Sequence, residues 1–220
     1  TQVVRPPVSR TFQQGTPGLS VTDTFTQYAS NNILDLLIVV DNSGSMGQEQ
    51  AELANRLGAL LTYVQDADWR IGVVTTDVRG GTASKNTMGS MITNPGKECL
   101  RAVIKKGDDD PNTPEDERTA LFFDAIDGSG TSGSGDEQGI RMAYEGLQCE
   151  ESPGVKWVRP DSTLAVLIVS DEDNCSNGNC GNNPWSEPTY LTDYMGSIRP
   201  LGVKAKVYSL SWFPGTTCNT

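Results

Sequence analysis

The sequence predicts an α/β fold, a three-layer arrangement in which helices flank an open, mostly parallel sheet. Two apolar runs, Ile33 to Val40 and Leu164 to Ser170, indicate central strands, because a parallel strand buried on both faces reads as a nearly continuous hydrophobic segment. Between them, apolar residues recur at helical spacing from about residue 48 to residue 65, which predicts a helix with one face against the sheet. Alternating strands and helices are typical of this fold class.

The remaining elements continue this alternation. We expect further strands over 69–76 and 203–210, short strands within 87–104, and helices over 113–127, 136–147 and 186–199. Residues 1–30 are rich in Thr, Gln, Pro and Ser, so we expect an extended arm with one edge strand near 21–28. Residues 31–220 then form one domain with insertions, which is long enough to bury a substantial core.

A short polar turn, Asp41-Asn42-Ser43-Gly44-Ser45, directly follows the first apolar run. Carboxylate and hydroxyl oxygens are hard ligands that suit Mg²⁺, Mn²⁺ or Ca²⁺. Ligands of open α/β sheets bind outside the carboxyl ends of the strands, and two serines spaced two apart on an extended turn can point the same way. The alternative is that Asp41, Ser43 and Ser45 only cap the helix that follows. The five residues alone do not separate these interpretations.

The D-x-S-x-S pattern resembles the metal-ion-dependent adhesion site of the von Willebrand factor type A family. Asp41, Ser43 and Ser45 match the first element of that site without substitution. The family's last site residue is an Asp after a second apolar strand, and here the second apolar run ends at Asp171. The elements occur in the family's order, and the resemblance extends over roughly residues 30–212. It implies the α/β fold predicted above.

The middle element of the family's site is a Thr five residues before a Gly that is followed by Ile or Leu. Gly139 is such a glycine, and it places Ser134 at the threonine position. Serine keeps the hydroxyl and loses the methyl group. The surrounding 128–135 segment is rich in Gly and Ser, which leaves the register open, so Thr131 or Ser132 is an alternative middle ligand.

The resemblance implies recognition through a bound cation, Mg²⁺ or in its place Mn²⁺ or Ca²⁺. Ser43 and Ser45 would bind it directly, and Ser134 directly or nearly so. Asp41 and Asp171 would act mainly through ordered waters. Because few anionic ligands then contact the cation, an Asp or Glu of a protein partner, or an acidic group of a glycan, would complete its coordination.

Three more acidic residues lie near the proposed site in the sequence. Asp77 follows the second predicted strand, which the resemblance places beside the first and parallel to it. Glu172 and Asp173 follow Asp171 directly. We expect all three at the rim of the site, where Glu172 and Asp173 tune the local electric field or hold a loop.

Composition excludes several functions. The net charge is −11 and histidine is absent, which argues against nucleic acid binding and removes any Ser-His-Asp or Cys-His catalytic apparatus. No apolar stretch reaches the roughly 18 residues that span a bilayer. A Mg²⁺-dependent phosphatase of the D-x-D type is a minor alternative, because Ser43 occupies the position of its second acid. We therefore expect a protein that is not an enzyme.

The five cysteines favour an oxidising compartment. Cys175 and Cys180 flank a short loop, Cys99 and Cys149 could staple an insertion to the body, and Cys218 is left over. Zinc is disfavoured, because paired C-x-x-C motifs and histidine are both missing. An intracellular adaptor of an ATPase or metal-insertion machine is the main alternative, and it would require reduced thiols.

The resemblance is to bacterial outer-surface and pilus-associated members of the family. It implies a secreted bacterial adhesion module that lies outside the cell, on its surface or in the periplasm, as part of a larger surface protein or assembly. The family's last strand and final helix are not evident after Trp212. We therefore expect the domain to be incomplete at its C-terminus.

Overall fold

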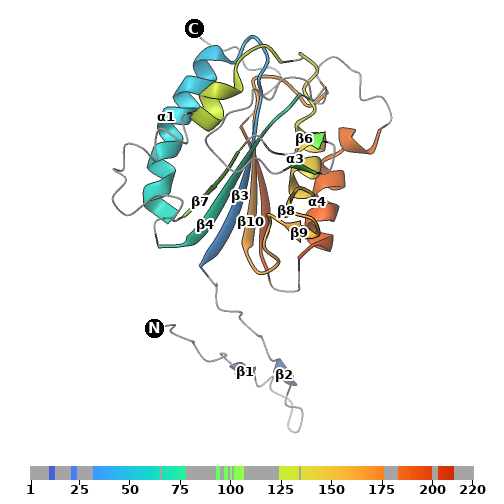
Figure 1. Ribbon diagram of the computed structural model, residues 1–220. Coiled ribbons are helices and arrows are strands. Elements are labelled where there is room, and N and C mark those ends of the chain that lie inside the picture. The colour runs from blue at the N-terminus through green and yellow to red at the C-terminus, as the bar shows by residue number, and fades with distance from the viewer. Residues whose placement is uncertain are drawn as a thin grey trace.

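A five-stranded sheet forms the centre of the molecule in the computed structural model (Figure 1). The structure describes residues 10–12, 21–23, 32–64, 66–77, 93–94, 97–98, 100, 102–106, 124–133, 135–175, 183–199 and 203–210. The strand order is β11-β10-β3-β4-β7. The strands are β3 (Ile33–Val40), β4 (Asp68–Thr75), β7 (Ala102–Lys105), β10 (Thr163–Val169) and β11 (Ala205–Leu210).

Four neighbouring strands of this sheet, from β11 to β4, run parallel, and β7 lies antiparallel along β4 at one edge. The predicted mostly parallel sheet is therefore confirmed. Strand β4 also lies beside β3, with Val40 opposite Thr75. The carboxyl ends of β3, β4 and β10 consequently meet at one end of the sheet.

Helices cover both faces of the sheet (Figure 1). Helix α1 (Gly47–Val64) lies on one side, and helices α3 (Gly139–Leu147) and α4 (Pro188–Ser197) lie on the other. Two short 3₁₀ turns are η1 (Asp127–Ser129) and η2 (Pro184–Ser186). The result is the predicted three-layer arrangement.

Side chains of β3 alternate between two hydrophobic clusters, as the period of two in a strand requires. Leu37 and Val39 pack with Ala143 and Leu147 of α3 on one face. On the other face, Leu36, Ile38 and Val40 pack in the cluster that contains Ala54 of α1. Six of the eight residues of β3 are buried, which explains why the strand reads as a continuous apolar run.

The predicted elements within the described residues agree with the structure at most positions. Helix α3 begins at Gly139, three residues after its predicted start near residue 136, because residues 136–138 continue the loop that leads to the sheet end. A helical turn is present at 124–126, and most of the predicted 113–127 helix lies outside the described residues. The sequence did not predict the hairpin of β8 (Glu150–Ser152) and β9 (Val155–Lys156).

The predicted arm and insertion contain four short strands. Strands β1 (Arg10–Phe12) and β2 (Val21–Asp23) pair antiparallel with each other in a sheet of their own. The start of the edge strand predicted near 21–28 thus coincides with β2. Strands β5 (Thr93–Asn94) and β6 (Lys97–Glu98) form another small pair within the 87–104 stretch.

A buried ion pair holds the amino end of the central strands. Asp35 of β3 is fully buried, and its carboxylate accepts hydrogen bonds from Arg159 Nε at 2.9 Å, Nη2 at 2.7 Å and the backbone N–H at 2.6 Å. Arg159 also pairs with Asp68 at the start of β4. Burial alone would lower the pKa of Arg159, but its bonds to Asp35 and the charges of Asp35 and Asp68 raise that pKa above its ordinary value.

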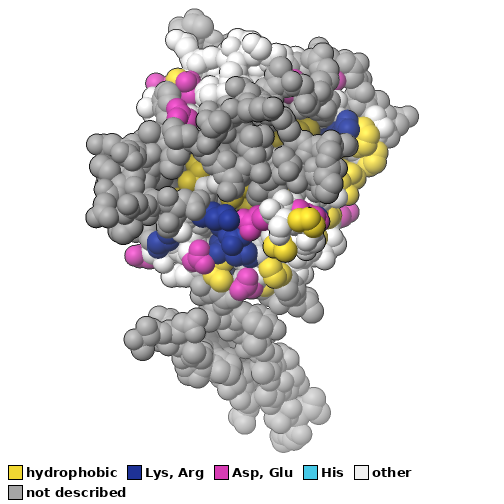
Figure 2. All heavy atoms as spheres, in the orientation of Figure 1, with side chains coloured by type: hydrophobic (Ala, Val, Ile, Leu, Met, Phe, Trp, Pro, Cys, Tyr) yellow, Lys and Arg dark blue, Asp and Glu magenta, His cyan; other side chains and the backbone are white. Residues whose placement is uncertain are grey.

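Charges at this amino end are matched within the chain. Figure 2 shows Lys and Arg side chains interspersed with Asp and Glu over the lower part of the described surface. Among the pairs, Glu151 lies 2.6 Å from Lys105 Nζ and 3.4 Å from Arg70 Nη1. The carboxyl ends of the parallel strands, at the opposite end of the sheet, have a different arrangement of charges.

Candidate metal centre

Asp41 is fully buried at the point where β3 ends. Its backbone N–H donates to Val169 O at 2.9 Å, which places it beside the end of β10. Its carboxylate accepts from Ser43 N at 2.8 Å and from Ser170 Oγ at 2.6 Å. Each oxygen thus accepts a hydrogen bond, and the carboxylate is fixed in orientation between two strand ends.

The two serines of the turn bring their hydroxyls together. Ser43 Oγ and Ser45 Oγ lie 3.0 Å apart, and Ser43 is buried whereas Ser45 is exposed. Helix α1 begins only at Gly47, and among the described residues no hydrogen bond joins either hydroxyl to the first turn of that helix. This geometry favours the ligand interpretation of the turn over the capping interpretation.

The loop that carries the middle ligand candidates lies against this turn. Gly133 N donates to Asn42 O at 2.7 Å, and Gln50 Nε2 bridges Asp41 O at 2.7 Å and Gly130 O at 3.0 Å. Thr131 is close as well, because its carbonyl oxygen would lie 3.9 Å from a Cβ built on Gly44. The sequence-distant segments are therefore adjacent, as the predicted site requires.

The identity of the middle ligand stays a prediction. Ser134 lies outside the described residues, and Thr131 and Ser132 are described and exposed. The approach of the loop to the turn depends on Gly133, since a Cβ there would lie 2.4 Å from Asn42 Oδ1. A side chain at position 133 would push the loop away from the turn.

Asp171, the last predicted ligand, lies beside the turn at the end of β10. It is partly buried, and its Oδ1 is a buried atom without a hydrogen-bond partner. Burial raises the pKa of Asp171, the charge of Asp41 raises it further, and a hydrogen bond from Ser45 lowers it. An orphaned buried carboxylate oxygen calls for a ligand or an ordered water.

Sequence reasoning missed Glu137 and Thr76. Glu137 is buried just before α3, and Thr76 Oγ1 donates a short hydrogen bond to its Oε2. Burial raises the pKa of Glu137 to about 8; the bond from Thr76 lowers it and the charge of Asp41 raises it. Ser170 was also missed, and its position directly before Asp171 was the available signal.

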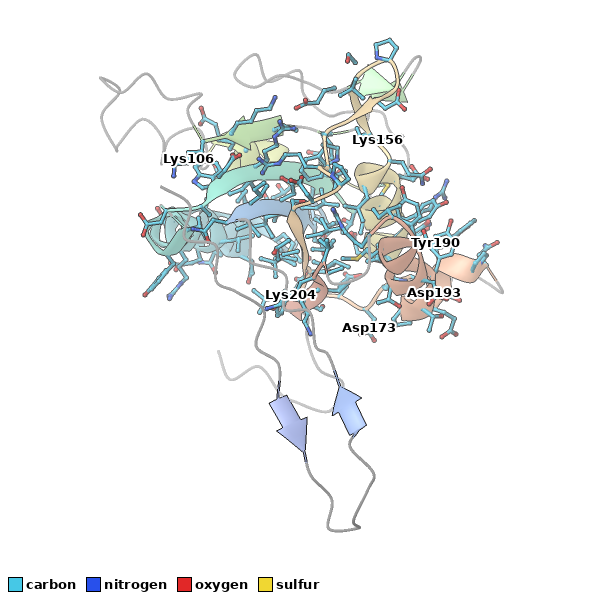
Figure 3. All side chains as sticks on the ribbon, turned by 90° about the horizontal axis from the view of Figure 1, so that it is seen from below. Lys106, Lys156, Asp173, Tyr190, Asp193 and Lys204 are labelled. Carbon is cyan, nitrogen blue, oxygen red and sulfur yellow. The ribbon has the colours of Figure 1, made fainter. Side chains whose placement is uncertain are left out.

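The three predicted rim residues lie around this end of the sheet. Asp77 follows β4 and is partly exposed. Glu172 N donates to Ser170 Oγ at 3.0 Å, and the charge of Glu172 helps to raise the pKa of Asp171 and Glu137. Asp173 is exposed and lies close to α4 in Figure 3.

The donor set suits a hard divalent cation in its chemistry. Two carboxylates, one of them with an orphaned oxygen, and two converging hydroxyls are brought together, and Mg²⁺, Mn²⁺ and Ca²⁺ prefer such ligands. Among the described residues, no Lys or Arg forms an ion pair with Asp41 or Asp171. That part of the chain also has no cluster of three His, Cys, Asp or Glu side chains able to hold a metal.

Other predicted features have mixed outcomes. Cys149 and Cys175 each take part in a disulfide bond. The other three cysteines, Cys99, Cys180 and Cys218, lie outside the described residues. The pairings of Cys99 with Cys149 and of Cys175 with Cys180 therefore stay predictions. None of the described helices has both the length and the apolarity needed to cross a membrane.

Comparisons with known proteins add little to this geometry. No protein-family model matches the chain, and no curated protein sequence matches it. A structure of proximal thread matrix protein 1 from the mussel byssus, in its second crystal form, aligns with a TM-score of 0.39 at 12% identity. The alignment covers 81% of this chain and 37% of that chain, and a likeness at this score does not establish a shared fold.

Proposed function

We propose that this protein is a divalent-cation-dependent recognition module of the von Willebrand factor A type. In this proposal an acidic group of a partner, a protein or a glycan, completes the coordination of Mg²⁺, Mn²⁺ or Ca²⁺ at the Asp41 turn. The observation that carries the proposal is the fully buried Asp41 carboxylate beside Asp171, neither of which pairs with a described basic residue. A buried charge is costly unless an opposite charge compensates it.

Each residue of the turn has a defined part in this proposal. Ser43 and Ser45 supply hydroxyl ligands, and Asp41 and Asp171 supply negative charge around them. A middle hydroxyl from the 131–134 loop completes the set. The cation, when bound, supplies the positive charge that attracts the partner's carboxylate.

Neighbouring residues keep the site ready for binding. The Ser170 hydroxyl and the Ser43 N–H hold the Asp41 carboxylate in one orientation. Gln50 is buried and ties the turn to the 130–133 loop through two backbone carbonyls. Such positioning lowers the entropy lost when a cation and its partner bind.

Cellular context is part of the same proposal. The disulfide-bonded state of Cys149 and Cys175 favours an oxidising compartment. It supports a secreted protein, outside the cell, on its surface or in the periplasm, over the intracellular adaptor. In the same proposal the protein is part of a larger surface assembly. The role is recognition, not catalysis.

Acetate is a direct probe of the proposed function. In the presence of Mn²⁺ and the protein, the acetate methyl protons should relax faster than in Mn²⁺ alone, because the carboxylate binds next to a slowly tumbling paramagnetic ion. Asp41→Ala should remove the additional relaxation while leaving the circular dichroism spectrum unchanged. Equal relaxation with the wild type and with Asp41→Ala would sink the proposal.

A further inference from the structure

An apolar cavity of about 250 Å³ lies next to the candidate metal centre. It lies between the ends of β10 and β11 and the first turns of α3 and α4. Its walls are formed mainly by aliphatic side chains, namely Ile140, Ile168, Leu191 and Val207. Most of the cavity surface is therefore hydrophobic, although polar side chains also line it.

The cavity and the candidate metal centre share side chains. Ser170, which donates to Asp41 Oδ2 at 2.6 Å, also lines the cavity. Thr76 and Glu137, which are hydrogen-bonded to each other, also line the cavity, and Glu137 lies near Asp41 of the candidate metal centre. A partner whose carboxylate reaches the cation is thus adjacent to an apolar cavity on the same molecule.

The size of the cavity fits one large apolar side chain. An apolar cavity of roughly 150 Å³ is enough to hold benzene, whereas pockets for drug-sized ligands begin at about 300 Å³. Large apolar side chains that fill pockets are also the usual anchors of protein interfaces. The aliphatic walls disfavour a sugar, whose hydroxyls would lose hydrogen bonds to water on entry.

The charges at the cavity direct the partner's carboxylate elsewhere. Glu172 and Asp173 line it, and the lining residues that the structure describes include no Lys or Arg. An acidic group would be repelled there and attracted to the cation. The two groups of the partner are thereby assigned to different places.

We propose that the partner is a protein segment whose metal-binding Asp or Glu is accompanied by a large apolar side chain that enters this cavity. The inference rests on the proposed function and narrows its partner from a protein or glycan to a protein. Recognition then has two points, a carboxylate on the cation and a hydrophobic anchor beside it. Neither point alone gives the full affinity.

Small probes separate the two points. Acetate, 3-phenylpropanoate and glucuronate should be titrated by NMR into the protein with Mg²⁺, and the neutral 3-phenylpropan-1-ol with Mg²⁺ and with EDTA. We expect 3-phenylpropanoate to bind about tenfold or more tightly than acetate, because its ring is removed from water. The alcohol should bind under both conditions, with nuclear Overhauser contacts to the methyl groups of Ile168 and Val207.

A matched pair of variants on α4 provides the control. Thr192 is exposed and lines the cavity, and Thr189 is exposed on the same helix without lining it. Thr192→Trp should fill the cavity, abolish alcohol binding and reduce 3-phenylpropanoate to the affinity of acetate. Thr189→Trp should change neither affinity.

The outcomes distinguish this inference from the proposed function. If Mg²⁺ and acetate fail to bind while the alcohol binds and Thr192→Trp blocks it, the proposed function is wrong and the cavity still takes an apolar group. Equal affinities of acetate and 3-phenylpropanoate overturn the inference, as does alcohol binding that Thr192→Trp leaves unchanged. Tighter binding of glucuronate than of 3-phenylpropanoate overturns it in favour of a glycan.

Discussion

Two aspartates at the opposite ends of β3, Asp35 and Asp41, are both fully buried but are compensated in different ways. Asp35 lies in a fork of hydrogen bonds from Arg159. Asp41 accepts bonds from the Ser170 hydroxyl and the Ser43 N–H, no described Lys or Arg pairs with it, and the carboxyl groups of Asp171 and Glu137 lie nearby. The chain itself neutralises the charge of Asp35 at one end of β3. We propose that a bound cation neutralises the charge of Asp41 at the other end.

The difference separates a structural charge from a functional one. A buried carboxylate with an arginine partner stabilises one arrangement of the strands, and nothing needs to enter. The charge of Asp41 raises the pKa of Asp171 and of Glu137, so these carboxyl groups leave an electrostatic cost in the folded protein. Such a cost is expected where a ligand binds.

The largest effect is expected on the free energy of unfolding, from loss of the ion pair at the amino end of β3. Arg159→Met would leave Asp35 buried without a counter-charge, and removing one partner of a buried ion pair typically costs about 3–5 kcal/mol of unfolding free energy. Urea unfolding monitored by tryptophan fluorescence measures this loss. The double variant Asp35→Asn with Arg159→Met should recover part of it, and a loss below about 1 kcal/mol in the single variant would contradict the buried pairing.

The next largest effect is expected on Mg²⁺ affinity, from a substitution in the loop that approaches the Asp41 turn. Gly133→Ala places a methyl group 2.4 Å from Asn42 Oδ1, so the loop with the middle ligand must shift. We expect Mg²⁺ affinity to fall by about tenfold or more, which is about 1.4 kcal/mol. Calorimetric titration measures this change.

Gly44→Ala is the matched control for that variant. A Cβ at Gly44 would lie 3.9 Å from Thr131 O, which is an ordinary contact, and Mg²⁺ affinity should stay within twofold of the wild type. If both alanine variants lower the affinity equally, the close approach at Gly133 has no special role.

A smaller effect, on the pH dependence of stability, is expected from Glu137 in metal-free protein. Its pKa is raised from 4.5 to about 8 in the folded state, so between these values the folded protein keeps a proton that the unfolded chain has lost. Stability therefore falls as the pH rises through this window. In EDTA, as the pH rises from 4.5 to about 8, we expect the melting temperature of the wild type to decrease by a few degrees more than that of Glu137→Gln. Parallel curves of melting temperature against pH would contradict the raised pKa.

The fold was largely predictable from sequence, because strands buried on both faces and an amphipathic helix leave clear patterns. Asp35 shows the limit of that reading. It sits inside the apolar run of β3, and its partner Arg159 is distant in sequence, so only the folded chain reveals the ion pair. The β8–β9 hairpin was missed because Glu150–Ser152 and Val155–Lys156 are too short and polar to show an alternating pattern.

The candidate site was predictable where its residues follow strand ends directly. Asp41, Ser43, Ser45 and Asp171 were predicted in this way, and the structure brings them to one place. Glu137 carried no such signal, because it precedes α3 and follows no strand directly, and only the fold brings it close to Thr76 and Asp41.

The central claim is that a divalent cation neutralises the carboxylates at the Asp41 end of β3. Isothermal titration of Mg²⁺ into three proteins tests it most directly: the wild type, Asp41→Asn, and the double variant Asp35→Asn with Arg159→Met, with folding checked by circular dichroism. We predict saturable binding of a single Mg²⁺ by the wild type and the double variant, and none by Asp41→Asn. Absence of binding to the wild type at millimolar Mg²⁺, or equal binding by the wild type and Asp41→Asn, would contradict the account.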